Sequence, residues 1–178
     1  MRPIALMKVA LAAMCLAAVA SSAAHASLDI LVDKSSQRMT VVVDGVKRYT
    51  WKVSTGKLGY ATPSGTFQPF RMERDHYSDE WDNAPMPYSI FFTYQGHAIH
   101  GSYYTSRLGS AVSHGCIRLA PRNAATLYSL VAREGMGNTR VIVAGGKVAV
   151  GDALAPITRQ IKKIVPKVKS QFWWTRRR

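Results

Sequence analysis

One cysteine in a glycine-containing loop, preceded along the chain by a histidine, is the feature of this sequence best suited to chemistry. Cys116 lies in the stretch Ser113-His114-Gly115-Cys116-Ile117-Arg118, and His100 precedes it. The other cysteine, Cys15, falls in a predicted export signal. A lone thiol in an exported protein has no internal partner, so it is either a reactive group or a small buried hydrophobe. The adjacent glycine, histidine and arginine favour a reactive thiolate.

His100 and Cys116 have the residue types of a base and a nucleophile. If their segments pair in the fold, His100 takes the Cys116 proton and the thiolate attacks an amide or ester carbonyl to form a thioester. A backbone carbonyl, that of Gly101 or Ser102, is expected to orient the imidazole, because no Asp or Asn motif lies nearby. Backbone N–H groups of the loop are the candidates for an oxyanion hole: those of His114, Gly115 and Cys116.

A zinc site is the main alternative for these side chains. Three histidines and the cysteine make up a set of four candidate ligands: His97, His100, His114 and Cys116. Residues an odd number of positions apart in an extended strand face opposite sides, so His97 and His100 are predicted to point away from each other. We therefore predict no metal and no cofactor, and we interpret His97 as an ordinary histidine.

The N-terminal segment has the organisation of a secretory signal. Arg2 and Lys8 give a positive start, residues 9–20 are apolar and uncharged, and Ala24-His25-Ala26 matches the A-x-A cleavage pattern. An uncleaved anchor is disfavoured, because the apolar run is shorter than the ~20 residues that span a bilayer. We expect cleavage near Ala26 and export to the periplasm.

The elements that must position the site are mostly strands. The hairpin signal Asp44-Gly45 joins two runs of branched apolar residues, and Thr62-Pro63-Ser64-Gly65-Thr66 predicts a turn. The predicted strands cover residues 28–32, 39–43, 46–54, 88–94, 97–100 and 140–144. One helix is predicted from Pro121 to Gly135, since proline suits a first helical position and glycine a helix end. We expect a β-sandwich or curled sheet with one principal α-helix.

The chain of 178 residues carries a formal net charge of +14, and much of this charge lies near its end. Residues 147–178 hold nine basic side chains and one acidic side chain. An exported chain meets anionic lipids and wall polymers, so we expect no nucleic-acid partner. Two interpretations of the tail are open: its apolar residues and Phe172-Trp173-Trp174 contact a membrane or wall surface, or they pack on the domain and the charges are solvated.

The residues described above resemble the signature of the L,D-transpeptidase catalytic domain, the YkuD-like family. The resemblance lies in His100-Gly101 and in the 113–118 stretch, and it is supported by Thr62-Pro63-Ser64-Gly65-Thr66-Phe67 and Met86-Pro87-Tyr88. It divides the chain into three parts: a signal peptide over residues 1–26, a catalytic domain over 27–146 and a basic C-terminal tail over 147–178.

The resemblance implies a transferase of wall biogenesis and cell shape that acts on peptidoglycan stem peptides. In that family the cysteine attacks the bond between the L-centre of meso-diaminopimelate and a terminal D-alanine, releases D-alanine and passes the acyl group to an amine. Carried over, Cys116 is the nucleophile, His100 the base, and the Gly101 carbonyl orients His100. Ser113 and Arg118 match motif positions, and either they orient the substrate or they hold the loop by hydrogen bonds. Apart from the resemblance, Tyr88, Tyr103 and Tyr104 are candidates to line the acyl-donor groove, with packing in the core as the alternative.

Several alternatives stay open at this level. The acyl acceptor is a second stem peptide, an outer-membrane protein or lipoprotein, or water, and water would make the enzyme an L,D-carboxypeptidase or amidase. A non-catalytic wall-binding protein is the alternative of a different class. The stretch 73–82 holds five of the ten acidic residues, and it is either a solvated loop or a cover over the groove that meets ammonium groups of the substrate.

Overall fold

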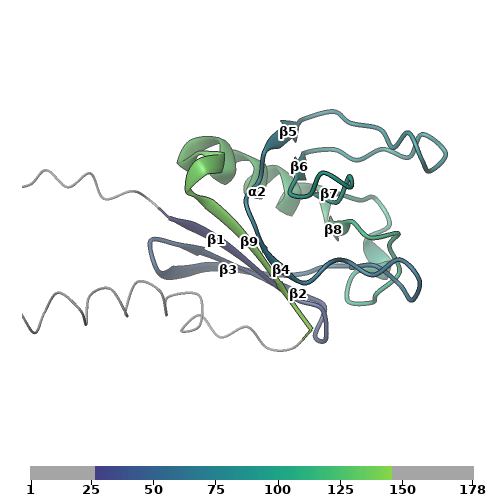
Figure 1. Cartoon of the computed structure of the whole chain (residues 1–178), viewed down its shortest axis with the longest axis horizontal. Helices are drawn as coiled ribbons and strands as arrows, with labels where there is room; N and C mark the ends of the chain where they lie inside the picture. Colours follow the sequence, from purple (N-terminus) through teal and green to yellow (C-terminus); the bar gives the residue numbers. More distant parts are fainter. Residues whose placement is uncertain (1–26, 146–178) are drawn as a thin grey trace, which may run out of the picture.

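The computed structural model describes residues 27–145, which form two β-sheets and one main helix (Figure 1). The first sheet has the order β3-β2-β1-β9-β4: β1 (Leu28–Asp33), β2 (Arg38–Val43), β3 (Val46–Lys52), β4 (Gly65–Phe67) and β9 (Thr139–Ala144). The second has the order β5-β6-β7-β8: β5 (Arg71–Glu73), β6 (Ser89–Phe91), β7 (Ala98–Gly101) and β8 (Ile117–Leu119). The helical elements are α2 (Pro121–Glu134), η1 (Thr105–Arg107) and η2 (Met136–Asn138). The predicted fold class, mostly β with one principal helix, is confirmed.

The first sheet begins with the predicted hairpin and closes with a long-range pairing. Asp44 and Gly45 have φ values of 51° and 75°, as a two-residue turn with both φ angles positive requires. β1 pairs antiparallel with β2 on one side and parallel with β9 on the other. Because β1 lies at the centre of this sheet, nearly all of its residues are buried.

The two sheets and α2 share one hydrophobic core. It combines side chains from β1, β2, β9, the second sheet and the helix, among them Ile30, Val41, Val141, Ile90, Ile99, Ile117, Leu119, Leu127 and Val131. Full burial of one such side chain contributes about 1.5–3 kcal/mol to folding. This core supports the inner face of β7 and β8 and leaves their other face for the site.

Helix α2 begins and ends where the sequence predicts. Pro121 occupies the first turn, where its missing N–H costs no hydrogen bond. Gly135 follows the last helical residue with a φ of 86°, and its N–H donates to the Val131 carbonyl at 2.9 Å. No helix within the described range is long and apolar enough to cross a bilayer.

Some predicted elements differ from the structure. The strand predicted over 88–94 is limited to β6, because a turn closed by the Gly96 N–H on the Thr93 carbonyl begins there and leaves Tyr94 exposed. The short strands β4, β5 and β8 were not predicted. The predicted signal peptide and the basic tail lie outside the described residues.

Candidate active site

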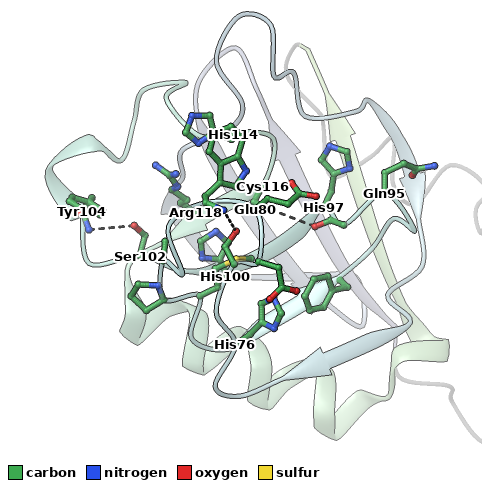
Figure 2. A pocket seen from close by; sticks show the side chains of 18 of the residues that line it. His76, Glu80, Gln95, His97, His100, Ser102, Tyr104, His114, Cys116 and Arg118 are labelled. Atoms are coloured by element: carbon green, nitrogen blue, oxygen red, sulfur yellow. Dashed lines mark hydrogen bonds between the residues drawn. The ribbon is translucent and has the colours of Figure 1, made fainter.

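The parallel pairing of β7 with β8 brings the histidine and the cysteine to one face of the second sheet. His100 is opposite Arg118 in the register, and Cys116 is two positions before Arg118. Side chains two apart in an extended segment share a face. Ile99 and Ile117, which alternate with these residues, point into the core. The strand pairing expected from the sequence therefore exists, and both His100 and Cys116 line the same pocket (Figure 2).

His100 is oriented by the backbone carbonyl next to it. Its Nδ1 lies 2.8 Å from the Gly101 carbonyl oxygen, so Nδ1–H donates and Nε2 keeps the lone pair of a base. The residue is only 5% exposed. Burial lowers the pKa of His100 to about 4, against the opposing effect of the Gly101 hydrogen bond. The imidazole is therefore neutral near pH 7 and able to accept a proton.

Cys116 is a free, half-buried thiol, and its raised pKa keeps it neutral near pH 7. It packs against Met86, Phe91 and Ala98, and its Sγ makes a weak hydrogen bond to the Gly96 carbonyl at 3.8 Å. Burial raises the pKa of the thiol, the Ala98 backbone and the Arg118 charge lower it, and Glu80 raises it. A neutral thiol beside a neutral base fits proton transfer during attack rather than a preformed ion pair.

We predict opposite shifts of the thiol pKa from two charge-removing substitutions. Arg118→Gln raises the pKa of Cys116, because it removes a positive charge, and Glu80→Gln lowers it. The pH dependence of iodoacetamide alkylation measures both shifts in the folded protein, since only the thiolate reacts. Two shifts of the same sign would show that these side chains do not act through their charges.

The depressed pKa of His100 also predicts how stability depends on pH. Histidine titrates near 6.5 in the unfolded chain and His100 near 4 in the folded one. Between these pH values the unfolded chain binds more protons than the folded one, so the free energy of unfolding rises with pH. The contribution of His100 to stability is lost as the pH falls from 6.5 towards 4. The His100 contribution is about 3 kcal/mol. Urea unfolding between pH 4 and 7 measures how the free energy of unfolding depends on pH. We expect this dependence to be less steep for His100→Gln than for the parent protein, and equal slopes would contradict the low pKa of His100.

The loop before Cys116 is held by its own hydrogen bonds. Ser113 is fully buried, and its Oγ accepts from the Gly115 N–H at 3.2 Å and donates to the Cys116 carbonyl at 2.5 Å. Gly115 has a φ of 115°, and a Cβ there would lie 3.0 Å from the His97 ring. Because the Gly115 N–H is directed to Ser113, the N–H groups of His114 and Cys116 are the better candidates for an oxyanion hole.

All four candidate zinc ligands line the same pocket, contrary to the expectation from strand alternation that His97 points away from His100. His97 lies in the turn before β7 rather than within it, so alternation does not apply. Its Nδ1 is 2.8 Å from the Thr93 hydroxyl, and its ring packs on Gly115. No three His, Cys, Asp or Glu side chains within residues 27–145 are grouped so that they could hold a metal ion.

Comparisons with known proteins agree with this arrangement. A model of the L,D-transpeptidase catalytic domain family, YkuD, matches residues 27–151. The chain belongs to this family. The YkuD protein of Bacillus subtilis (strain 168) is 27% identical over 103 residues, 57% of this chain and 59% of that protein.

Solved L,D-transpeptidases have the same fold. The enzyme from Mycobacterium smegmatis is 27% identical with a TM-score of 0.61, and the match covers 67% of this chain and 59% of that one. L,D-transpeptidase 3 from Mycobacterium tuberculosis, in complex with a faropenem-derived adduct, is 26% identical with a TM-score of 0.58, over 66% of this chain and 60% of that one. The chain therefore spans about three fifths of the length of these relatives.

Only some of the residues predicted to bind substrate line the pocket of this L,D-transpeptidase domain. Arg118 and Tyr104 line the pocket, and Tyr103 does too. Tyr88 instead packs edge-on against Tyr128 of α2, with ring centroids 5.8 Å apart, and has a φ of 59°. Ser113 is buried in the loop, as described above. Its contacts are structural, whereas a substrate contact for Arg118 and Tyr104 stays a prediction.

The acidic stretch 73–82 contributes several of the side chains that line the pocket of this L,D-transpeptidase domain. Trp81 stacks on His114 with ring centroids 3.8 Å apart and an interplanar angle of 5°. Tyr60 contacts both rings edge-on. Glu80, next to Trp81, lines the pocket near Cys116 and His97 (Figure 2). The sequence predicts a loop here, and a cover over the groove was one of its two interpretations. No local sequence pattern predicts the contacts among the rings of Tyr60, Trp81 and His114.

Proposed function

We propose that the protein is an exported cysteine L,D-transpeptidase that acts on peptidoglycan tetrapeptide stems through a Cys116 thioester. The observation that carries the proposal is the pairing of β7 with β8, which places a buried neutral His100, oriented by the Gly101 carbonyl, in one pocket with the Cys116 thiol. Membership of the L,D-transpeptidase family supplies the substrate class.

The acylation step follows from the protonation states of the two groups. His100 Nε2 takes the thiol proton while Sγ attacks the carbonyl that joins the L-centre of meso-diaminopimelate to D-alanine. Negative charge develops on the carbonyl oxygen, which backbone N–H groups of the catalytic loop stabilise. The C–N bond breaks, His100 returns its proton to the leaving amine, and D-alanine departs.

The second step transfers the acyl group to an amine. The amine of another stem peptide, or of an outer-membrane protein or lipoprotein, attacks the thioester carbonyl, and neutral His100 accepts the amine proton. The C–S bond breaks and the proton passes to Cys116. An amine on a second stem gives a 3-3 cross-link. Arg118 in the pocket suits the carboxylates of a stem peptide, because guanidinium groups bind carboxylates in bidentate geometry.

The export part of the proposal has its own test. The charged start, apolar run and Ala24-His25-Ala26 pattern support a signal peptide that is cleaved near Ala26, with a periplasmic mature enzyme. The measurement is the N-terminal sequence and intact mass of the protein from the periplasmic fraction. A mature chain that starts at Ser27 supports export, and a full-length chain confined to the cytoplasm contradicts it.

Incubation with disaccharide-tetrapeptides, followed by mass spectrometry, tests the reaction. Cross-linked dimers that lack one D-alanine are expected with the parent protein and not with Cys116→Ala. Release of D-alanine without dimers would indicate an L,D-carboxypeptidase or a protein acceptor. Binding without any release would instead favour a non-catalytic wall-binding protein.

A further inference from the structure

Thr62 lies beneath the catalytic loop and makes a direct hydrogen bond to it. The residue is 1% exposed. Its Oγ1 donates to the Gly115 carbonyl at 2.7 Å and accepts from the Gly56 N–H at 2.9 Å. A threonine hydroxyl has only one hydrogen. Because the Gly56 N–H supplies its own hydrogen, the hydroxyl hydrogen goes to Gly115, and the bond has a fixed direction.

This bond sets the direction of the backbone N–H of the cysteine. The Gly115 carbonyl and the Cys116 N–H belong to one planar trans peptide unit, in which C=O and N–H point in opposite directions. When Thr62 holds the carbonyl, the Cys116 N–H is aimed away from Thr62. A buried bond of this kind resists rotation of the peptide unit, because breaking it leaves the Gly115 carbonyl and the Thr62 hydroxyl hydrogen without partners.

The preceding peptide unit of the loop is held from the same side. The Lys57 N–H donates to the Ser113 carbonyl at 3.0 Å, so the His114 N–H also points away from the segment 54–62. None of the residues that line the pocket comes from that segment, whereas His114 and Cys116 both do line it. The two N–H groups therefore face the side on which a substrate carbonyl approaches.

We propose that Thr62 is a positioning residue for acyl transfer: its hydroxyl holds the Gly115 carbonyl and thereby aims the Cys116 N–H at the developing oxyanion. The inference rests on the proposed function only in taking Cys116 as the nucleophile. It gives a role to the first residue of the Thr62-Pro63-Ser64-Gly65-Thr66 turn, which lies 53 positions before Gly115.

The test compares two reactions of the same thiol in the full-length protein. Acylation by 4-nitrophenyl acetate passes through a tetrahedral oxyanion: the C–S bond forms, the aryl ester C–O bond breaks, nitrophenolate leaves and the thiol proton goes to His100. Alkylation by iodoacetamide displaces iodide at a saturated carbon and forms no oxyanion. Loss of the oxyanion hole slows only the first reaction, whereas a general disturbance of the thiol slows both.

Thr62→Val removes the hydroxyl at similar volume. We expect acylation to fall about 10- to 100-fold, less than the loss from deleting a donor outright, and alkylation to change less than about 3-fold. Thr62→Ser keeps the hydroxyl and is expected to retain both rates. Equal losses in both reactions, or no loss of acylation, would overturn the proposal.

Two further variants control for the loss of a buried hydroxyl as such and for a valine variant that does not fold. Thr55 is buried to the same degree, and its hydroxyl accepts from the Gln37 side-chain amide at 2.7 Å rather than contacting the loop. Thr55→Val is therefore a matched loss of a buried hydroxyl and should not separate the two rates. Thr62→Ala leaves room for a water on the two backbone groups and carries the same test if the valine variant does not fold. Neither probe involves peptidoglycan, so a protein that forms no cross-links can still confirm or overturn the role of Thr62.

Discussion

Cys116→Ala is expected to abolish D-alanine release, with a loss on the order of 10⁴-fold or more, as when the nucleophile of an acyl-transfer enzyme is removed. Without the thiol no acyl-enzyme forms, and the residual pocket binds substrate without turning it over. The thiol packs against Met86, Phe91 and Ala98 at the edge of the core and makes one weak hydrogen bond, so the substitution should cost about 1 kcal/mol of folding stability or less. D-alanine release from tetrapeptides measures the effect.

The same variant separates chemistry from binding. Retention of disaccharide-tetrapeptide on the Cys116→Ala protein, together with a thermal unfolding midpoint within about 5 °C of the parent value, is the expected control result. Turnover by this variant above about one thousandth of the parent rate would contradict the assignment of Cys116, because general base and oxyanion effects alone do not sustain it.

His100→Gln is expected to lower the rate of acyl transfer by about 10²- to 10⁴-fold, the usual contribution of a positioned base. The parent enzyme should also show a characteristic pH profile. Since the pKa of His100 is about 4 and the pKa of Cys116 is raised by burial, the acylation rate should stay flat above about pH 5 until the thiol ionises. It should fall as the pH drops through about 4, where His100 becomes protonated.

Rate profiles of the two proteins decide whether the base is His100. The acid limb near pH 4 should be absent in His100→Gln, whose remaining rate should follow ionisation of the thiol alone. An acid limb that persists in the variant would place the titrating base elsewhere. His97 is the obvious other candidate, and His97→Gln is the matched control because it removes an imidazole from the same pocket.

Local signals predicted the elements whose geometry depends on a few adjacent residues. Asp44-Gly45 predicts its hairpin because a two-residue turn needs positive φ at both positions, which glycine and aspartate tolerate. Pro121 and Gly135 mark the helix for equally local reasons. The hydrogen bond of His100 to the Gly101 carbonyl could also be predicted from the sequence, since the two residues are neighbours in the chain.

Long-range pairings explain most of what the sequence did not reveal. Strand β8 has three residues and exists because it pairs with β7 and with Ser54 across the chain. The parallel pairing of β1 with β9 joins the two ends of the domain, and no local pattern specifies it. The hydrogen bond from Thr62 to Gly115 and the stack of Trp81 on His114 likewise join loops distant in sequence.

The predicted strand over residues 88–94 was wrong at its C-terminal end for a side-chain reason. Apolar and aromatic residues there satisfy a strand pattern, but the Thr93 hydroxyl accepts from the His97 N–H and contacts the His97 ring, which stabilises a turn instead. That turn carries His97 into the pocket. Hydrogen bonds from side chains to nearby backbone groups compete with the hydrogen bonds of a β-sheet. A hydropathy pattern does not detect these side-chain hydrogen bonds.

Intact-protein mass spectrometry after rapid quenching tests the central claim most directly. With a tetrapeptide donor whose meso-diaminopimelate side-chain amine is acetylated, so that no acceptor amine is present, a mass gain equal to the donor minus D-alanine is expected, mapped to the peptide that contains Cys116. The adduct should disappear when an acceptor amine is added. Cross-linked product without any adduct on Cys116, or an adduct mapped to another residue, would contradict the account.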